Sequence, residues 1–170
     1  MAPSGPFSNF DKKLRVRRLG SVACSTATYQ HFFVVRWGDS TAEDIERVIA
    51  EVNALREKVE VPVYYLGILP EDMPKINERQ RDDFMRLSET LLPVCGVFAV
   101  AIEAKGFRGA IQRSAMAAIT LLTRKYRGLR FVDSIESALD IEPEALPDMA
   151  GVDKALVDVG AEPPRPRAAS

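Results

Sequence analysis

Glycine and arginine occur together at one point of the chain, in GFRGAIQR over residues 106–113. An alanine-rich run typical of a helix follows. The first backbone N–H groups of a helix have no partner within the helix and attract anions. Gly106, Arg108, Gly109 and Arg113 are therefore one candidate site for a small anionic ligand, a lipid or a nucleotide. The alternative, a loop that turns into a packed helix, stays open because closely spaced glycines are common.

Groups that could catalyse a reaction are few and scattered. His31 is the single histidine, and no cysteine or second histidine lies near it in the sequence to form a dyad or a metal site. The chain has no GxSxG, HExxH or glycine-rich nucleotide motif. Acidic pairs such as Glu43-Asp44 and Asp82-Asp83 fall on predicted outward helix faces. We therefore predict a protein that is not an enzyme and that needs no metal or cofactor.

Composition favours a folded domain with a nearly neutral charge. Hydrophobic residues make up 46% of the 170 residues, which is enough for a core, and the formal net charge is −1. The chain as a whole therefore gives no reason to expect specific nucleic-acid binding. Cys24 and Cys95 lack metal or redox spacing, which is typical of reduced thiols. With neither a signal peptide nor an apolar run of membrane-spanning length, the sequence predicts a cytoplasmic protein.

The first half of the chain predicts two strands, a helix and a third strand. We expect strands over 15–25 and 30–38, joined as a hairpin around 26–29. Ser40 and Glu43 match a capping box, and apolar residues then follow at helical spacing. The run VPVYYLGIL, residues 61–69, predicts a strand buried on both faces.

The second half continues the alternation. It predicts a helix within 78–95, a buried strand over 96–104, a helix over about 107–126, a strand over 129–134 and a final helix that begins at Ser134. The fold class is thus α/β, a mixed sheet flanked by helices in the order β-β-α-β-α-β-α-β-α. On the helix after Gly106, small residues such as Ala110, Ser114 and Ala117 favour deep burial over a self-association face.

This order resembles that of the anti-sigma-factor antagonist superfamily, the STAS domain and its SEC14-like relatives. WGDSTAED is similar to that group's strand-to-helix turn, and GFRGAIQRSAMAAITLL followed by LRFVDSIESALDI is similar to its closing helix and strand. The resemblance covers about residues 15–142. It implies a STAS-like domain that acts by binding other proteins.

One departure from that group concerns its phosphorylation switch. In its signalling members a partner kinase phosphorylates a serine in the turn after a central strand. The matching turn here, LPEDMPKINERQ, contains no serine or threonine, and neither occurs anywhere from residue 42 to 87. The resemblance therefore implies a protein that serine phosphorylation does not switch in the usual way. Glu71 and Asp72 either imitate a phosphorylated turn or simply solvate a loop.

Two further features are candidate protein contacts. Trp37 ends a predicted strand, where we expect a sheet edge, and it either anchors a partner or closes the core. Beyond the domain, apolar residues recur at helical spacing over 146–162. Such a segment either folds back on its own domain or inserts into a partner's groove. Its candidate contact residues are Met149, Val152, Leu156 and Val159.

Taken together, the sequence predicts three parts. These are a flexible arm over 1–13 with a basic stretch after it, a STAS-like domain over 14–143, and a C-terminal part over 144–170 that ends in a Pro/Arg tail. We expect a non-enzymatic protein–protein interaction module in bacterial regulation or a larger assembly, with a protein partner and homo-oligomer formation as a second mode. The alternative is the small anionic ligand at residues 106–113.

Overall fold

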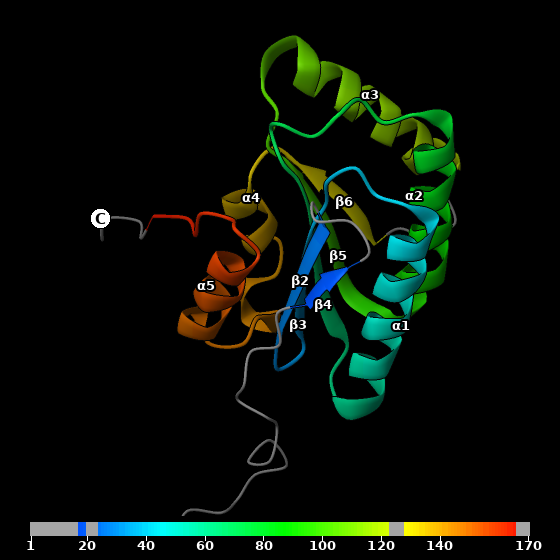
Figure 1. Cartoon of the computed structure of the whole chain (residues 1–170). Helices are drawn as coiled ribbons and strands as arrows, with labels where there is room; N and C mark the ends of the chain where they lie inside the picture. The colour runs from blue at the N-terminus through cyan, green and yellow to red at the C-terminus, as the bar shows by residue number, and fades with distance from the viewer. Residues whose placement is uncertain (1–16, 20–23, 123–127, 166–170) are drawn as a thin grey trace, which may run out of the picture.

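A six-stranded sheet forms the centre of the molecule in the computed structural model, which describes residues 17–19, 24–122 and 128–165 (Figure 1). The strands follow one another in space in their chain order. The first three pair antiparallel, and the third to sixth pair parallel. They are β1 (Arg17–Leu19), β2 (Cys24–Tyr29), β3 (Phe32–Arg36), β4 (Val63–Leu69), β5 (Cys95–Ile102) and β6 (Leu129–Val132).

Helices cover both faces of this sheet. The α-helices are α1 (Ala42–Lys58), α2 (Glu78–Leu91), α3 (Gly106–Leu122), α4 (Ile135–Leu139) and α5 (Met149–Asp158), with short 3₁₀ turns η1 (Leu92–Val94) and η2 (Pro143–Ala145). Figure 1 shows α1 and α2 on one side of the sheet, α4 and α5 on the other, and α3 across the top of the view. The predicted α/β class, a mixed sheet flanked by helices, is confirmed.

Two apolar cores lie on the two faces of the sheet. Helices α1, α2 and α3 connect consecutive parallel strands that move across the sheet in one direction, so crossovers of one hand place all three on one face. The first core contains aromatic pairs, among them Tyr65 stacked on Phe98 with ring centres 4.2 Å apart. The second core, under α4 and α5, is built on Phe32, Tyr64 and Leu66. All seven residues of β4 are buried because both faces of this strand are covered.

The start of the sheet differs from the prediction. The residues expected to turn the chain, 26–29, belong to β2, and the turn lies at Gln30 and His31. Gln30 takes a positive φ of 51°, which a tight connection between antiparallel strands requires. Alternation in this stretch was the weaker signal, because β2 is built largely of small residues such as Ala27 and Thr28, which pair with Val34 and Phe33 of β3.

The cap of α1 differs by one residue. Thr41, not Ser40, is the N-cap, and its side chain accepts from the backbone N–H of Asp44 while the Asp44 carboxylate accepts from the backbone N–H of Thr41. Asp44 is fully buried. The prediction that it lies on an outward helix face was therefore wrong, because the cap turns its side chain inward.

The C-terminal segment folds back onto the sheet. Helix α5 packs Val152, Ala155 and Leu156 into the second core. Just beyond the C-cap Val159, Gly160 has a φ of 80°, which allows the N–H of Ala161 to donate to the carbonyl of Leu156. The folded unit therefore extends past residue 143. The predicted arm over 1–13 and the end of the Pro/Arg tail lie outside the described residues.

Candidate functional site

Both glycines at the start of α3 have a structural explanation. Gly106 has a φ of 62°, a conformation that favours glycine at the entry to the helix. A Cβ on Gly109 would lie 2.0 Å from the carbonyl oxygen of Ala104. Glycine at this position therefore allows the first turn to lie against the end of β5, a packing role that needs no ligand.

Arg108 and Arg113, the predicted anion-binding arginines, are both exposed. The Nη1 atom of Arg113 lies close to the first turn, 2.9 Å from the position of a Cβ on Gly109. The structure thus brings Gly106, Arg108, Gly109 and Arg113 together in the first two turns of α3. They form an open, positively charged helix start and not a buried cradle.

The side of α3 that faces solvent is apolar. Phe107 is 83% exposed, the most exposed of the large hydrophobic side chains in the described part of the chain. Successive turns of the helix continue the same side with small side chains. We call this surface the α3 outer face; it consists of Phe107, Ala110, Ile111, Ser114, Ala117 and Ala118. Ile111 and Ala118 are half-buried and the other four are exposed.

The expectation that these small residues are deeply buried was wrong for Ala110, Ser114 and Ala117. Over residues 106–118, where the burial of α3 is described, the buried positions are instead Gly109, Gln112 and Met116. Gln112 is only 4% exposed, and its Oε1 atom has no hydrogen-bond partner. A polar group is thus buried while an apolar face is exposed, the reverse of an ordinary surface helix.

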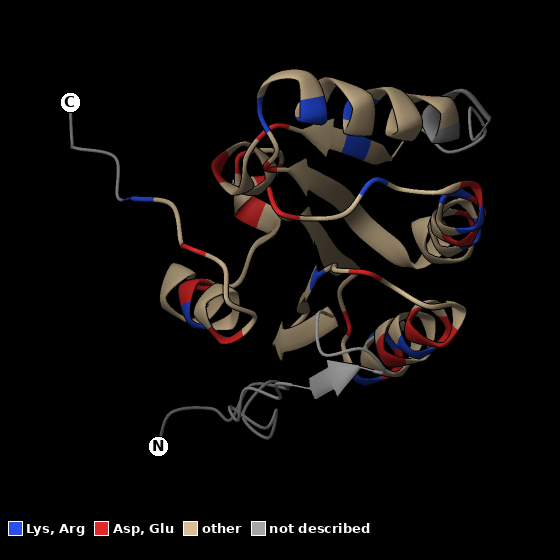
Figure 2. Cartoon of the chain, turned by 45° about the horizontal axis from the view of Figure 1, so that its top comes forward, with Lys and Arg blue, Asp and Glu red and all other residues tan. Residues whose placement is uncertain are grey.

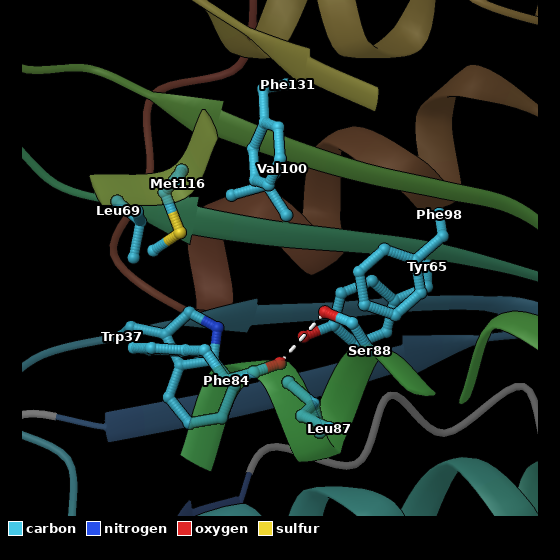
Figure 3. A pocket seen from close by; sticks show the side chains of 10 residues that line it. All are labelled: Trp37, Tyr65, Leu69, Phe84, Leu87, Ser88, Phe98, Val100, Met116 and Phe131. Atoms are coloured by element: carbon cyan, nitrogen blue, oxygen red, sulfur yellow. Dashed lines mark hydrogen bonds between the residues drawn. The ribbon is translucent and has the colours of Figure 1, made fainter. Parts of the chain in front are cut away.

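A small cavity of about 20 Å³ lies beneath α3 (Figure 3). Met116 lines it from α3, Phe84, Leu87 and Ser88 line it from α2, and the sheet supplies aromatic and aliphatic side chains. The Ser88 hydroxyl donates to the carbonyl of Phe84, 2.9 Å away, so its proton is already used within α2. The cavity is too small for a nucleotide or a lipid, whose sites are roughly 300 Å³ or larger.

The other predicted contact residues are mostly buried. Trp37 is 1% exposed and packs edge-on against Phe84, with ring centres 5.0 Å apart. It follows β3, an interior strand, so the expected sheet edge is corrected. Val152, Leu156 and Val159 are buried in the second core, which leaves these three and Trp37 unable to touch a partner in this conformation. Met149, at 45% exposure, remains accessible.

The two cysteines are free thiols whose pKa values are raised. Burial raises the pKa of the Cys24 thiol and of the Cys95 thiol to about 12, so both stay protonated at neutral pH. His31 lies with Nε2 2.6 Å from the carbonyl oxygen of Ala145, which ties the ring to the backbone. No group of three His, Cys, Asp or Glu side chains among the described residues could hold a metal ion.

One arginine and several carboxylates, which the sequence did not predict to lie together, cluster where β3, β4 and β5 end. The guanidinium of Arg36 lies 3.7 Å from the carboxylate of Asp72. Burial raises the pKa of Glu103, the Arg36 charge lowers it, and the carboxylates of Glu162, Glu71 and Asp72 raise it. Residues so far apart in sequence meet because parallel strands end at one edge of the sheet. The Arg36 guanidinium thus interacts with several carboxylates. One of them belongs to Asp72, which lies in the turn without serine and has Arg36 as its structural partner.

The chain has no match among protein-family models, curated proteins or solved structures. In the parts that the structure describes, no helix combines the length and the apolar character needed to cross a bilayer. The candidate site therefore rests on the geometry of α3 alone.

Proposed function

We propose that this protein is a protein–protein interaction module that binds its partner through the α3 outer face. The observation that carries the proposal is the exposure of Phe107, 83% of whose surface is open to solvent in line with further apolar residues. Aromatic side chains that protrude in this way are frequent anchors of interfaces. An exposed apolar patch on a soluble domain often marks such a site.

The STAS-like pattern of the sequence supports the same function. A relationship to that group, a role in regulation or assembly and a cytoplasmic setting all belong to the proposal and rest on sequence pattern. The alternative, a small anionic ligand at residues 106–113, has weaker support. Gly106 and Gly109 have backbone reasons for being glycine, and Arg108 and Arg113 stand in solvent and not in a buried cradle that would enclose a small ligand.

Affinity capture with the full chain tests the proposal. We expect wild type to recover a stoichiometric protein from cells of the source organism, and Phe107→Ser to recover at least about tenfold less, since aromatic anchors commonly contribute 2 kcal/mol or more. Thermal melting should be unchanged, because the Phe107 ring makes little contact with the rest of the protein.

Val157→Ser is the matched control. Val157 is a second exposed apolar side chain, 57% accessible, on α5 and away from the α3 outer face. This variant should capture as much partner as wild type. Equal capture by wild type and Phe107→Ser would contradict the proposal, and so would a full chain that recovers no protein at all.

A further inference from the structure

The charge of the segment around α3 is one-sided. From Lys105 to Val132 the sequence contains seven basic residues and no acidic residue, although the whole chain has 24 acids. Of the five α-helices in the described part of the chain, α3 is the one without an aspartate or glutamate. Figure 2 shows this contrast: α1 and α2 carry both colours of charge, and α3 carries only blue.

Helix geometry places the basic side chains beside the apolar face. With about 100° between successive residues, Arg108 lies about 100° to one side of Phe107 and Arg113 about 120° to the other. Both arginines are exposed, as is Lys105 just before the helix. The α3 outer face is thus an apolar strip with a positive charge along each flank.

We propose that the α3 outer face receives an amphipathic helix of a partner protein whose apolar stripe is flanked by aspartate or glutamate. This inference rests on the proposed function and names the chemistry of its partner. Carboxylates on the flanks of the incoming helix would face Arg108 and Arg113, and its apolar side chains would pack on Phe107.

The shape of the strip favours a helix over a lipid surface. Ala110, Ser114, Ala117 and Ala118 are small, so the backbone of another helix can approach α3 closely. The same small side chains would bury little area in a bilayer, where affinity scales with inserted apolar area.

Charge also argues against a second copy of this chain bound through the same face. Two α3 helices packed through this face would bring the exposed Lys105, Arg108 and Arg113 of both copies close together, with no acid on either helix to balance them. Like charges placed together at an interface disfavour association by up to several kcal/mol.

Selection from a displayed library of helical peptides tests the inference. Peptides are selected on the immobilised full chain and counter-selected on the Phe107→Ser variant. We expect the survivors to carry apolar residues at helical spacing with Asp or Glu on the flanks. Survivors with neutral or basic flanks would overturn the inference, and so would a selection that enriches no peptide.

A charge-reversal variant measures how much the two arginines contribute to binding. Arg108→Glu with Arg113→Glu should weaken binding of a selected peptide at least about tenfold, measured by fluorescence anisotropy at low salt. Lys58→Glu with Lys154→Glu makes the same change in net charge at exposed positions away from α3 and should leave binding unchanged. Equal weakening by the two double variants would overturn the inference, because overall charge would then suffice.

Three results would overturn this inference, and the first and the third of them leave the proposed function standing. A captured partner that depends on Phe107 but not on Arg108 and Arg113 leaves the proposed function intact and overturns the acidic helix. Phe107-dependent binding to vesicles of phosphatidylserine and phosphatidylcholine overturns it in favour of a lipid surface. Phe107-dependent self-association in sedimentation velocity overturns it in favour of a second copy.

Discussion

Phe107 and Gln112 lie in the opposite environments from those that their chemistry prefers. The phenyl ring is in solvent, and the amide is buried on the inward stripe of α3 with its Oε1 atom unpartnered. A buried carbonyl without a hydrogen bond costs about 1–3 kcal/mol of folding free energy. The two residues are five positions apart on one helix, so a single orientation of α3 accounts for both. A helix held in this orientation keeps Phe107 on the outside.

Replacing Gln112 by methionine tests this cost. Gln112→Met keeps the length of the side chain and removes the unpartnered oxygen, so we expect the free energy of unfolding to rise by about 1 kcal/mol in urea denaturation. Gln112→Glu, which buries a charge at the same place, should lower it. A methionine variant less stable than wild type would show that the amide has an energetic role in the native state.

For single residues, the sequence predicts which side chains lie close together better than it predicts which of them are buried. The four residues at the start of α3 do lie together, and the small residues of that helix were recognised. Which side of α3 faces the protein was not predictable, because apolar residues occur almost all around it and periodicity then gives no direction. The burial of Asp44 was not predictable either, because a carboxylate is expected at the surface unless its capping partner is known.

Helix α5 is held to the sheet by a close contact at a glycine. A Cβ on Gly151 would lie 2.0 Å from the ring of Tyr29. The Tyr29 hydroxyl in turn donates to the carboxylate of Asp148, the N-cap of α5, at 2.5 Å. The ring of Tyr29 therefore occupies the space that a side chain at residue 151 would need.

Replacing Gly151 by alanine should destabilise the protein, although alanine has the higher helix propensity. Alanine ordinarily stabilises a helix interior by up to about 1 kcal/mol relative to glycine. We expect Gly151→Ala to lower the free energy of unfolding by about 2 kcal/mol instead, because the added methyl group displaces α5 or the Tyr29 ring.

A double-mutant cycle separates the clash from other causes. In a Tyr29→Ser background the ring is absent, and Gly151→Ala should then be neutral or stabilising in the same urea measurement. Equal destabilisation in both backgrounds would rule out the clash as the cause.

Element existence and order were largely predictable, and element pairing less so. The buried strands β4 and β5 are continuous apolar runs in the sequence, and helices α1 and α2 have apolar residues at helical spacing. The fold-back of α5 was one of two open alternatives, because its apolar stripe fits a partner's groove as well as its own sheet. The strand predicted over 15–25 covers both β1 and the start of β2, so two strands were predicted as one.

The molecule as a whole keeps several acidic protons buried. Burial raises the pKa of Tyr64 to about 12, as it does for Cys24 and Cys95. In the unfolded chain the thiols release their protons near pH 9.0 and the phenol near pH 10.0. Between these values and about pH 12 the folded state therefore holds more protons than the unfolded state, and stability must fall as the pH rises.

Alkaline unfolding measures this effect. We expect the urea midpoint to change little between about pH 7 and pH 8 and to fall steadily above the unfolded thiol pKa of 9.0. The pair of substitutions Cys24→Ala and Cys95→Ala should make that decline shallower, because two of the buried protons are removed. A midpoint that stays constant up to pH 11 would contradict the buried state of these groups.

Three contacts join the two ends of the fold across most of the chain. Ser25 donates to the carbonyl of Val159, Tyr29 donates to Asp148, and His31 meets the carbonyl of Ala145, with separations in sequence of 134, 119 and 114 residues. These hydrogen bonds therefore join the start and the end of the fold, and all of the parallel strands lie between the joined segments in the sequence. The hairpin of β2 and β3 and the helix α5 hold each other in place, and displacing either of them would expose the second core.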